Sequence, residues 1–172
     1  MRIFLIGYMS SGKSTLGKVL AKRLNLKFID IDESFEEKYK ITINDFFIKF
    51  GEPKFRELEQ QLLISILNIE NAVISTGGGT PCYYDNLDLI NENGVSIYLK
   101  LHYKSIVARL KNTKKQRPLV KDLNDKEFEN YIEENLAKRE EYYSKAHHTI
   151  KSENLTINEL LKYIEENNIN KI

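Results

Sequence analysis

Short apolar runs alternate with helical periodicity along most of this chain. The runs at residues 3–6, 27–31, 72–75, 95–101 and 149–150 have the length and apolar content of strands. Between them apolar side chains recur at helical spacing, as at Leu16, Val19, Leu20 and Leu24. Strands that alternate with helices predict an α/β fold with three layers, in which helices cover both faces of a parallel sheet.

Capping and helix-breaking residues mark the ends of several helices. Thr42 begins a short helix that Gly51 ends, and Pro53 begins a second helix that runs to about residue 69. Further helices are predicted over residues 84–93, 106–110 and 126–143, and the last one begins at Thr156 in a capping box with Glu159. At 172 residues we expect the whole chain, 1–172, to form one domain.

Residues 111–125 are polar and lack periodicity. Such a long irregular segment in a compact domain is typical of a lid or binding loop, so we predict a mobile lid between core segments 1–110 and 126–172. A lid suits an enzyme that excludes water from a phosphoryl transfer. The alternative is a disordered surface loop.

The residues after the first strand have the spacing of a phosphate-binding loop, Gly7-x-x-x-x-Gly12-Lys13-Ser14. The glycines let backbone N–H groups point at an anion, and the following helix adds its positive N-terminal end. Lys13 would reach the β- and γ-phosphates, and the hydroxyl of Ser14 would hold Mg²⁺. A chance match is the alternative, but a strand precedes the loop and a helix follows it. The sequence therefore predicts a nucleoside triphosphate site.

Two carboxylates, Asp30 and Asp32, lie near the end of the second predicted strand. Residues two apart in a strand share a face, so we expect both carboxylates to point the same way. They would lie at the carboxyl end of the sheet, where α/β proteins bind ligands. The alternative is that these acids cap the next helix.

Arginine is scarce in this chain, with six arginines against twenty lysines. In such a chain an arginine marks a place that needs a planar fork for a carboxylate or phosphate. We therefore consider four arginines as candidate site residues: Arg56, Arg109, Arg117 and Arg139. Arg56 can pair with Glu59, three positions on, but these residues alone favour an ordinary surface ion pair.

Three consecutive glycines, Gly77, Gly78 and Gly79, follow the third predicted strand. They would let the backbone come close to a ligand, whereas the alternative is a plain flexible turn. Neighbouring Cys82 has no base paired with it in sequence, which favours a bystander over a nucleophile. The three histidines have no metal-ligand spacing.

Composition narrows the class of protein. The net charge is +1, with 26 basic and 25 acidic residues spread along the chain, which gives no footprint for nucleic acid or an anionic membrane. No apolar run approaches the ~18 residues of a membrane span, and Met1 leads into a strand without a signal peptide. The single cysteine, Cys82, cannot form an internal disulfide. We expect a cytoplasmic monomer that acts on small molecules.

The chain resembles shikimate kinase over almost its whole length. The resemblance rests on an ordered set of motifs rather than on the phosphate-binding loop alone. The motifs are G-x-M-x-x-G-K-S-T from Gly7 to Thr15, D-x-D at Asp30 and Asp32, F-R-x-x-E at Phe55, Arg56 and Glu59, the glycine triplet, R-P-L at Arg117 to Leu119, and R-x-x-x-Y at Arg139 and Tyr143. It implies a P-loop kinase fold, like that of nucleoside monophosphate kinases, with five parallel strands in the order 2-3-1-4-5.

The resemblance also implies a role for each motif. ATP would bind the loop residues Ser10, Ser11, Gly12, Lys13, Ser14 and Thr15, together with Arg109 on adenine and Arg117 from the lid. Metal would bind at Ser14 and, through a water, at Asp30. Shikimate would be bound by Asp32, Phe47, Phe55, Arg56, Gly77, Gly78, Gly79 and Arg139, with its helices at about 32–60. Lys13, Asp32 and Arg117 would be catalytic, and Glu59 would hold Arg56. The implied reaction is phosphorylation of the 3-hydroxyl of shikimate by ATP with Mg²⁺, in aromatic amino acid biosynthesis.

Two positions depart from the family pattern. Ser10 stands where the family usually has glycine; if the backbone there needs a positive φ, serine costs about 1 kcal/mol. Lys151 stands where relatives often carry an acid, which affects the expected adenine contacts. The alternative functions are a gluconate or nucleoside monophosphate kinase of the same fold, and a nucleotide switch without catalysis. Arg56, Arg139 and the glycine triplet argue against the other two kinases. Asp32 and the arginines would be unexplained in a nucleotide switch.

Overall fold

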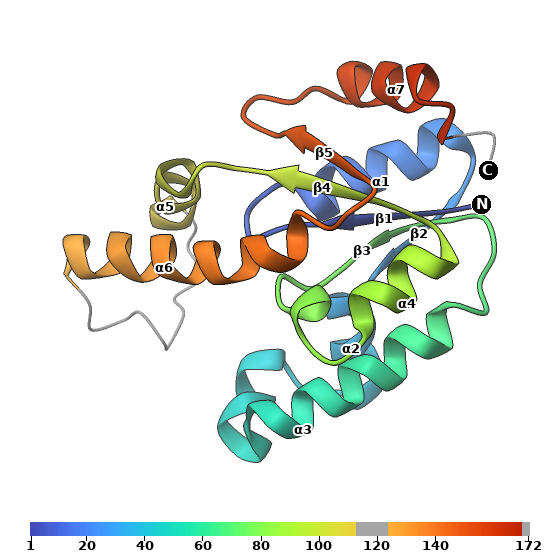
Figure 1. Ribbon diagram of the computed structural model, residues 1–172. Helices are drawn as coiled ribbons and strands as arrows, with labels where there is room; N and C mark the ends of the chain where they lie inside the picture. Colours follow the sequence, from blue (N-terminus) through green and yellow to red (C-terminus); the bar gives the residue numbers. More distant parts are fainter. Residues whose placement is uncertain (113–123, 170–172) are drawn as a thin grey trace.

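The computed structural model describes residues 1–112 and 124–169 (Figure 1). Its sheet contains β1 (Arg2–Ile6), β2 (Lys27–Asp30), β3 (Ala72–Ser75), β4 (Val95–Lys100) and β5 (His148–Lys151). All of the pairings between these strands are parallel, and their order is β2-β3-β1-β4-β5. The predicted fold class and strand order are confirmed.

Helices cover both faces of the sheet (Figure 1). The helices are α1 (Lys13–Leu24), α2 (Ile31–Tyr39), α3 (Ile43–Ile66), α4 (Asn86–Asn93), α5 (Tyr103–Lys111), α6 (Asp125–Tyr143) and α7 (Ile157–Glu166). Helices α1 and α7 lie on one face and the others lie on the opposite face. Strand β1 shows the alternation that this requires. Its Ile3 and Leu5 pack with Leu20 of α1, while Phe4 and Ile6 pack on the other face.

Helix α3 contains the break that the sequence predicts. Gly51 has φ 79° and ψ 166°, values outside the helical region, so two helices meet there at a kink. Thr42 caps the first half by accepting from the backbone N–H of Asp45. The second half ends at Ile66, three residues before the predicted end. A 3₁₀ turn, η1 (Thr80–Cys82), follows the glycine triplet, and Asn86 rather than Tyr84 begins α4.

The prediction that Asp30 and Asp32 share one face of a strand is wrong. Strand β2 ends at Asp30, and helix α2 begins at the next residue. The carboxylate of Asp30 accepts hydrogen bonds from the backbone N–H groups of Asp32 and Glu33, at 3.0 and 3.2 Å. An aspartate in this position satisfies N–H groups that a helix leaves unpaired, so Asp30 caps α2, as the alternative expected for that residue. Asp32 lies in the first turn of α2.

The predicted lid, 111–125, is only partly described. Lys111 ends α5 and Asp125 begins α6, and an ion pair of 2.9 Å joins their side chains. The two ends of the segment therefore lie together. Residues 113–123, and Arg117 with them, lie outside the described residues. Among the helices that the structure describes, none is both long and apolar enough to cross a membrane.

Candidate active site

The loop between β1 and α1 forms one side of a cavity. Gly7 and Gly12 have φ of 140° and 98°, and Ser10 has φ of 63°. The loop bounds a cavity of about 480 Å³, a volume in the range of small-molecule sites. Its lining comprises Ser10, Gly12, Lys13, Ser14, Thr15, Arg109 and Asn112. The N-terminal end of α1 opens into this cavity, which suits a phosphate group.

Lys13 bridges the loop from inside. Its ammonium group donates to the carbonyl oxygens of Gly7 and Tyr8, at 2.8 and 2.9 Å, and its side chain is buried. The charge therefore lies among the loop carbonyls, next to the cavity. A phosphate in the cavity would meet the lysine together with the N–H groups at the start of α1.

Ser14 and Asp30 face each other across the loop. The hydroxyl of Ser14 donates to Oδ2 of Asp30 at 2.5 Å and lies 3.4 Å from the hydroxyl of Ser75. No group of three or more His, Cys, Asp or Glu side chains able to hold a metal occurs among the described residues. A hydroxyl beside one carboxylate is nevertheless a donor set that fits Mg²⁺, because this ion usually binds through one or two carboxylates, waters and substrate phosphates.

The carboxyl group of Asp32 has a raised pKa. Burial raises the pKa of its carboxyl to about 6, against the lowering effect of Lys13. Glu59 and Asp30 raise this pKa further, and Arg56 lowers it. A carboxylate with a pKa near working pH is suited to accept a proton from a substrate hydroxyl.

Arg56 is buried among acids and aromatic rings. Its Nη1 donates to Glu59 at 2.8 Å, and its Nε and Nη2 donate to Glu52 at 3.1 and 2.9 Å. The guanidinium carbon lies 4.2 Å from the centre of the Tyr83 ring. Glu59 is 1% exposed, so this is a buried ion pair and the surface-pair interpretation is wrong. A planar guanidinium fixed in this way is prepared to bind a carboxylate.

Each glycine of the triplet lies against a different charged group. A β-carbon at Gly77 would lie 2.6 Å from Asp32, one at Gly78 would lie 3.3 Å from Arg139, and one at Gly79 would lie 2.5 Å from Arg56. None of the three has a positive φ. At Gly77 and Gly79 glycine is therefore required by space rather than by backbone conformation, whereas a β-carbon at Gly78 would only be tight, and the triplet is not a plain turn. It lets three functional groups from separate elements meet.

Arg139 reaches the same place from α6. Its guanidinium lies 4.9 Å from the centre of the Tyr8 ring. One turn further along α6, the hydroxyl of Tyr143 donates to the carbonyl oxygen of Gly78. Cys82 lies near both arginines, and burial raises the pKa of its thiol to about 11 against their opposing effect. The thiol therefore stays protonated at neutral pH, as expected of a bystander.

A family model of shikimate kinase matches residues 9–167. A shikimate kinase from Azobacteroides pseudotrichonymphae is 46% identical over 162 residues, which cover 94% of this chain and 95% of that protein. The chain belongs to the shikimate kinase family.

Solved structures of the family agree with this assignment. A shikimate kinase from Bacteroides thetaiotaomicron superimposes with a TM-score of 0.90 at 39% identity, covering 96% of this chain and 97% of that one. One from Acinetobacter baumannii, solved in complex with shikimate, has a TM-score of 0.86 at 31% identity, and the coverage is 96% and 93%. The whole architecture of a shikimate kinase is therefore shared, not only the phosphate-binding loop.

Ser10 and Lys151, the two positions expected from the sequence to depart from the family pattern, have different surroundings. Ser10 has the positive φ that makes serine unfavourable. Arg109 donates to its carbonyl oxygen at 2.9 Å and also to that of Ser152 at 3.5 Å. Lys151 is exposed, while the next residue, Ser152, is buried and donates to the carbonyl oxygen of Ser11 at 3.2 Å. The loop after β5 thus contacts the phosphate-binding loop through Ser152.

The aromatic candidates form one wall beside Arg56. The rings of Phe47 and Phe55 are 4.7 Å apart, and their centres lie 5.9 and 5.0 Å from the guanidinium carbon of Arg56. Phe55 is also a core residue, because it packs on Phe35. The chain therefore has aromatic rings packed next to the guanidinium group of Arg56.

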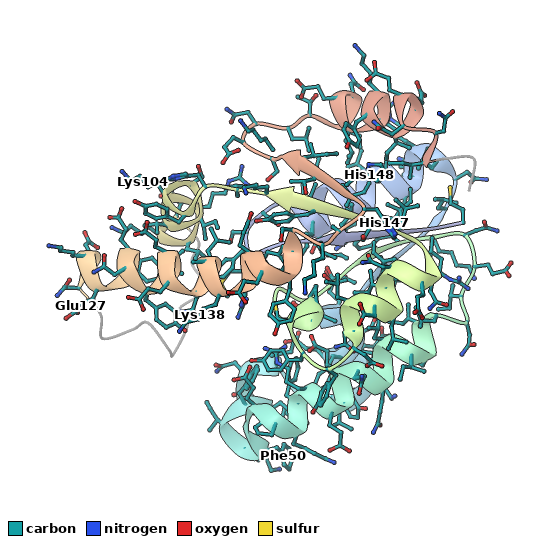
Figure 2. The ribbon with its side chains drawn as sticks, viewed as in Figure 1. Phe50, Lys104, Glu127, Lys138, His147 and His148 are labelled. Atoms are coloured by element: carbon teal, nitrogen blue, oxygen red, sulfur yellow. The ribbon has the colours of Figure 1, made fainter. Side chains whose placement is uncertain are left out.

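Sequence reasoning missed three contacts of the arginines. Glu52 lies four residues before Arg56, and the spacing rule that found Glu59 would have found it too. Tyr83 and Tyr8 stack on Arg56 and Arg139, and no sequence pattern indicates either contact. The histidines are structural: His147 and His148 lie at the start of β5 (Figure 2), where His147 accepts from the backbone N–H of Ser96 at 3.2 Å.

Proposed function

We propose that this chain transfers the γ-phosphoryl group of ATP to the 3-hydroxyl of shikimate. The observation that carries the proposal is the position of Asp32, whose carboxylate lies against Gly77 of the triplet and interacts electrostatically with both Lys13 of the loop and Arg56 of α3. A carboxylate between a phosphate site and a carboxylate site suits an acceptor that has both a hydroxyl and an acid group. Shikimate has both, and a family member is solved with it.

Backbone and Lys13 would hold the donor. The loop N–H groups from Ser10 to Thr15 would bind the β- and γ-phosphates, and the lysine would move from the loop carbonyls onto them. Ser14 and Asp30 would hold Mg²⁺, Asp30 through a water. The ion, when bound, would neutralise charge on the phosphates. Arg109 and the segment around Ser152 would form the adenine side.

Arg56 and Arg139 would clasp the carboxylate of shikimate, with Gly78 offering a backbone N–H and Phe47 and Phe55 contacting the ring. Two guanidinium groups on one carboxylate fix its orientation as well as its charge. The triplet glycines leave room for the acceptor between these groups. The hydroxyl to be phosphorylated would then point at Asp32.

Asp32 would accept the proton of the 3-hydroxyl of shikimate while the oxygen of that hydroxyl forms a bond to the γ-phosphorus. The bond from that phosphorus to the bridging oxygen breaks, and ADP leaves with the electron pair. Positioning and charge neutralisation provide most of the rate in such transfers. Arg117 would add positive charge from the lid over the transferring group.

The test is a coupled assay of ADP release with ATP and Mg²⁺, in which shikimate, gluconate and nucleoside monophosphates are added separately or omitted. We expect shikimate alone to raise the rate at least about a hundredfold over its absence, because only it fills both sites. A comparable rate with gluconate or a monophosphate would favour those kinases. Slow hydrolysis that ignores every acceptor would favour the nucleotide switch.

We also propose that the enzyme is a cytoplasmic monomer with a lid at residues 111–125. Hydrogen exchange in this segment should slow when nucleotide and shikimate are added together, because closure of a lid protects its amides. Exchange that ignores both ligands would contradict the lid. Light scattering at micromolar concentration tests the oligomeric state.

A further inference from the structure

A chain of hydrogen bonds runs behind Arg56 into the interior. Nη1 of Arg56 donates to Oε2 of Glu59 at 2.8 Å, and the hydroxyl of Thr80 donates to Oε1 of the same carboxylate at 2.6 Å. The amide of Asn86 in turn donates to the carbonyl oxygen of Thr80 at 2.9 Å. The chain joins α3 to η1 and to the first residue of α4.

The three residues behind the arginine are sealed from water. Thr80 and Asn86 are 0% exposed, and Glu59 is 1% exposed. A buried carboxylate is stable only when its oxygens have hydrogen-bond partners. Arg56 supplies a partner for one oxygen, and Thr80 supplies a partner for the other. The Thr80 hydroxyl therefore fixes the rotation of the carboxylate to which Arg56 is bound.

Thr80 is itself held rigidly. Its backbone N–H donates to the carbonyl oxygen of Gly77 at 3.2 Å, and its own carbonyl is bound by Asn86. A β-carbon at Gly77 would lie 2.8 Å from both the Thr80 hydroxyl and Glu59, so no side chain fits between them. Thr80 is 0% exposed, so bulk water does not reach its hydroxyl.

We propose that Thr80 is a positioning residue for substrate recognition: it orients Glu59, which holds Arg56 in the geometry that binds the carboxylate of the acceptor. The inference rests on the proposed function, since it assigns Arg56 to the carboxylate of shikimate. Thr80 does not touch the substrate. Loss of its hydroxyl should therefore weaken the grip on the carboxylate and leave the transfer step largely unchanged.

The test compares Thr80→Val, which removes the hydroxyl at equal volume, with Thr80→Ser, which keeps it. We expect Thr80→Val to raise KM for shikimate about tenfold with kcat within about threefold, since hydrogen bonds to charged groups have this strength. Thr80→Ser should stay within about twofold of the wild type. Thr76→Val is the matched control, because Thr76 is a buried threonine of the same segment whose hydroxyl donates only to the carbonyl oxygen of Leu5.

A second acceptor separates positioning from general damage. It is the analogue in which the carboxylate of shikimate is replaced by a primary alcohol. For this compound Thr80→Val and the wild type should have the same KM within about twofold, because no carboxylate is present for Arg56 to bind. An equal loss for both acceptors, or no loss for shikimate, would overturn the inference.

A second variant covers the case in which Thr80→Val does not fold, and the activity of the wild type separates failure of the proposed function from failure of the role of Thr80. If Thr80→Val does not fold, as judged by thermal unfolding, Thr80→Ala removes the same hydroxyl without adding a methyl group against Glu59, and the same KM comparison then decides. Wild-type enzyme that does not phosphorylate shikimate would refute the proposed function. Wild-type activity together with an unaffected Thr80→Val would refute only the role of Thr80.

Discussion

The proposed function divides this site into a donor half and an acceptor half, which are built in different ways. The phosphate-binding part of the donor half is a single loop from Gly7 to Thr15, and Arg109 and Asn112 complete the lining of its cavity. The acceptor half brings together side chains from α2, α3 and α6 around the backbone of the glycine triplet. The phosphate-binding loop is local in sequence, whereas the acceptor half exists only when separate elements pack.

The two halves also differ in what surrounds their buried charges. Lys13 of the donor half is 8% exposed and donates to backbone carbonyls. Arg56 and Glu59 of the acceptor half are 7% and 1% exposed and pair with each other. Removal of one partner of a buried ion pair leaves an uncompensated charge. We therefore expect substitutions in the acceptor half to be severe and specific, and those in the donor backbone to be mild.

The largest effect is expected at Asp32, where the two halves meet. Asp32→Asn should lower kcat by about 10²–10⁴-fold, because the amide cannot accept the hydroxyl proton. The fold should remain and become more stable at pH 7, by on the order of 1–3 kcal/mol, since a partly buried charge is removed. Steady-state kinetics and thermal unfolding measure both, with Asp88→Asn on the exposed face of α4 as the control. Near-normal turnover would exclude the assigned role.

The next effect concerns the acceptor arginines. Arg139→Lys should raise KM for shikimate about 10- to 100-fold, because lysine keeps the charge but loses the planar fork. KM for ATP should change by less than about threefold. Arg23→Lys, at an exposed position near the end of α1, is the matched control. If KM for both substrates rises equally, Arg139 supports the fold rather than the acceptor.

The pH dependence of kcat/KM should report the titration of Asp32, which lies between the donor and acceptor halves. The pKa of Asp32 is about 6 in the folded protein, so kcat/KM should fall as pH decreases through about 6. The free energy of unfolding should change with pH in the opposite direction to kcat/KM. The folded pKa lies above the ordinary value of 3.8, so the folded state holds this proton more tightly, and the stability contributed by the neutral acid is lost as pH rises through about 6. A kcat/KM profile that is flat from pH 5 to 8 would contradict this assignment.

The smallest effect is expected in the donor loop. Ser10→Gly should relieve the positive φ of 63°, and we expect KM for ATP to fall by about two- to fivefold with kcat unchanged. The free energy of unfolding should change little, because glycine also adds freedom to the unfolded chain. Titration of the nucleotide in the absence of shikimate isolates the donor half. Weaker ATP binding by Ser10→Gly would show that Ser10 contributes a contact that outweighs its strain.

Local sequence patterns predicted much of the secondary structure of this molecule. The strands, the break at Gly51 and the capping box at Thr156 follow from residues close in sequence. The same local reasoning failed where two local preferences compete. Asp30 ends a strand and can also cap a helix, and the structure uses its two oxygens separately, one for the α2 N–H groups and one for Ser14. The prediction that Asp30 and Asp32 share a strand is wrong because α2 begins immediately after β2.

The sequence by itself determined the fold class, the strand order through the family resemblance, and the phosphate-binding loop, because each depends on spacing along the chain. Only the tertiary structure decided that Tyr83 lies against Arg56 and Thr80 against Glu59, and that the glycine triplet makes room for three charged groups. These contacts join residues that are far apart in the chain. Their energies come from burial, which no local pattern contains until the elements pack together.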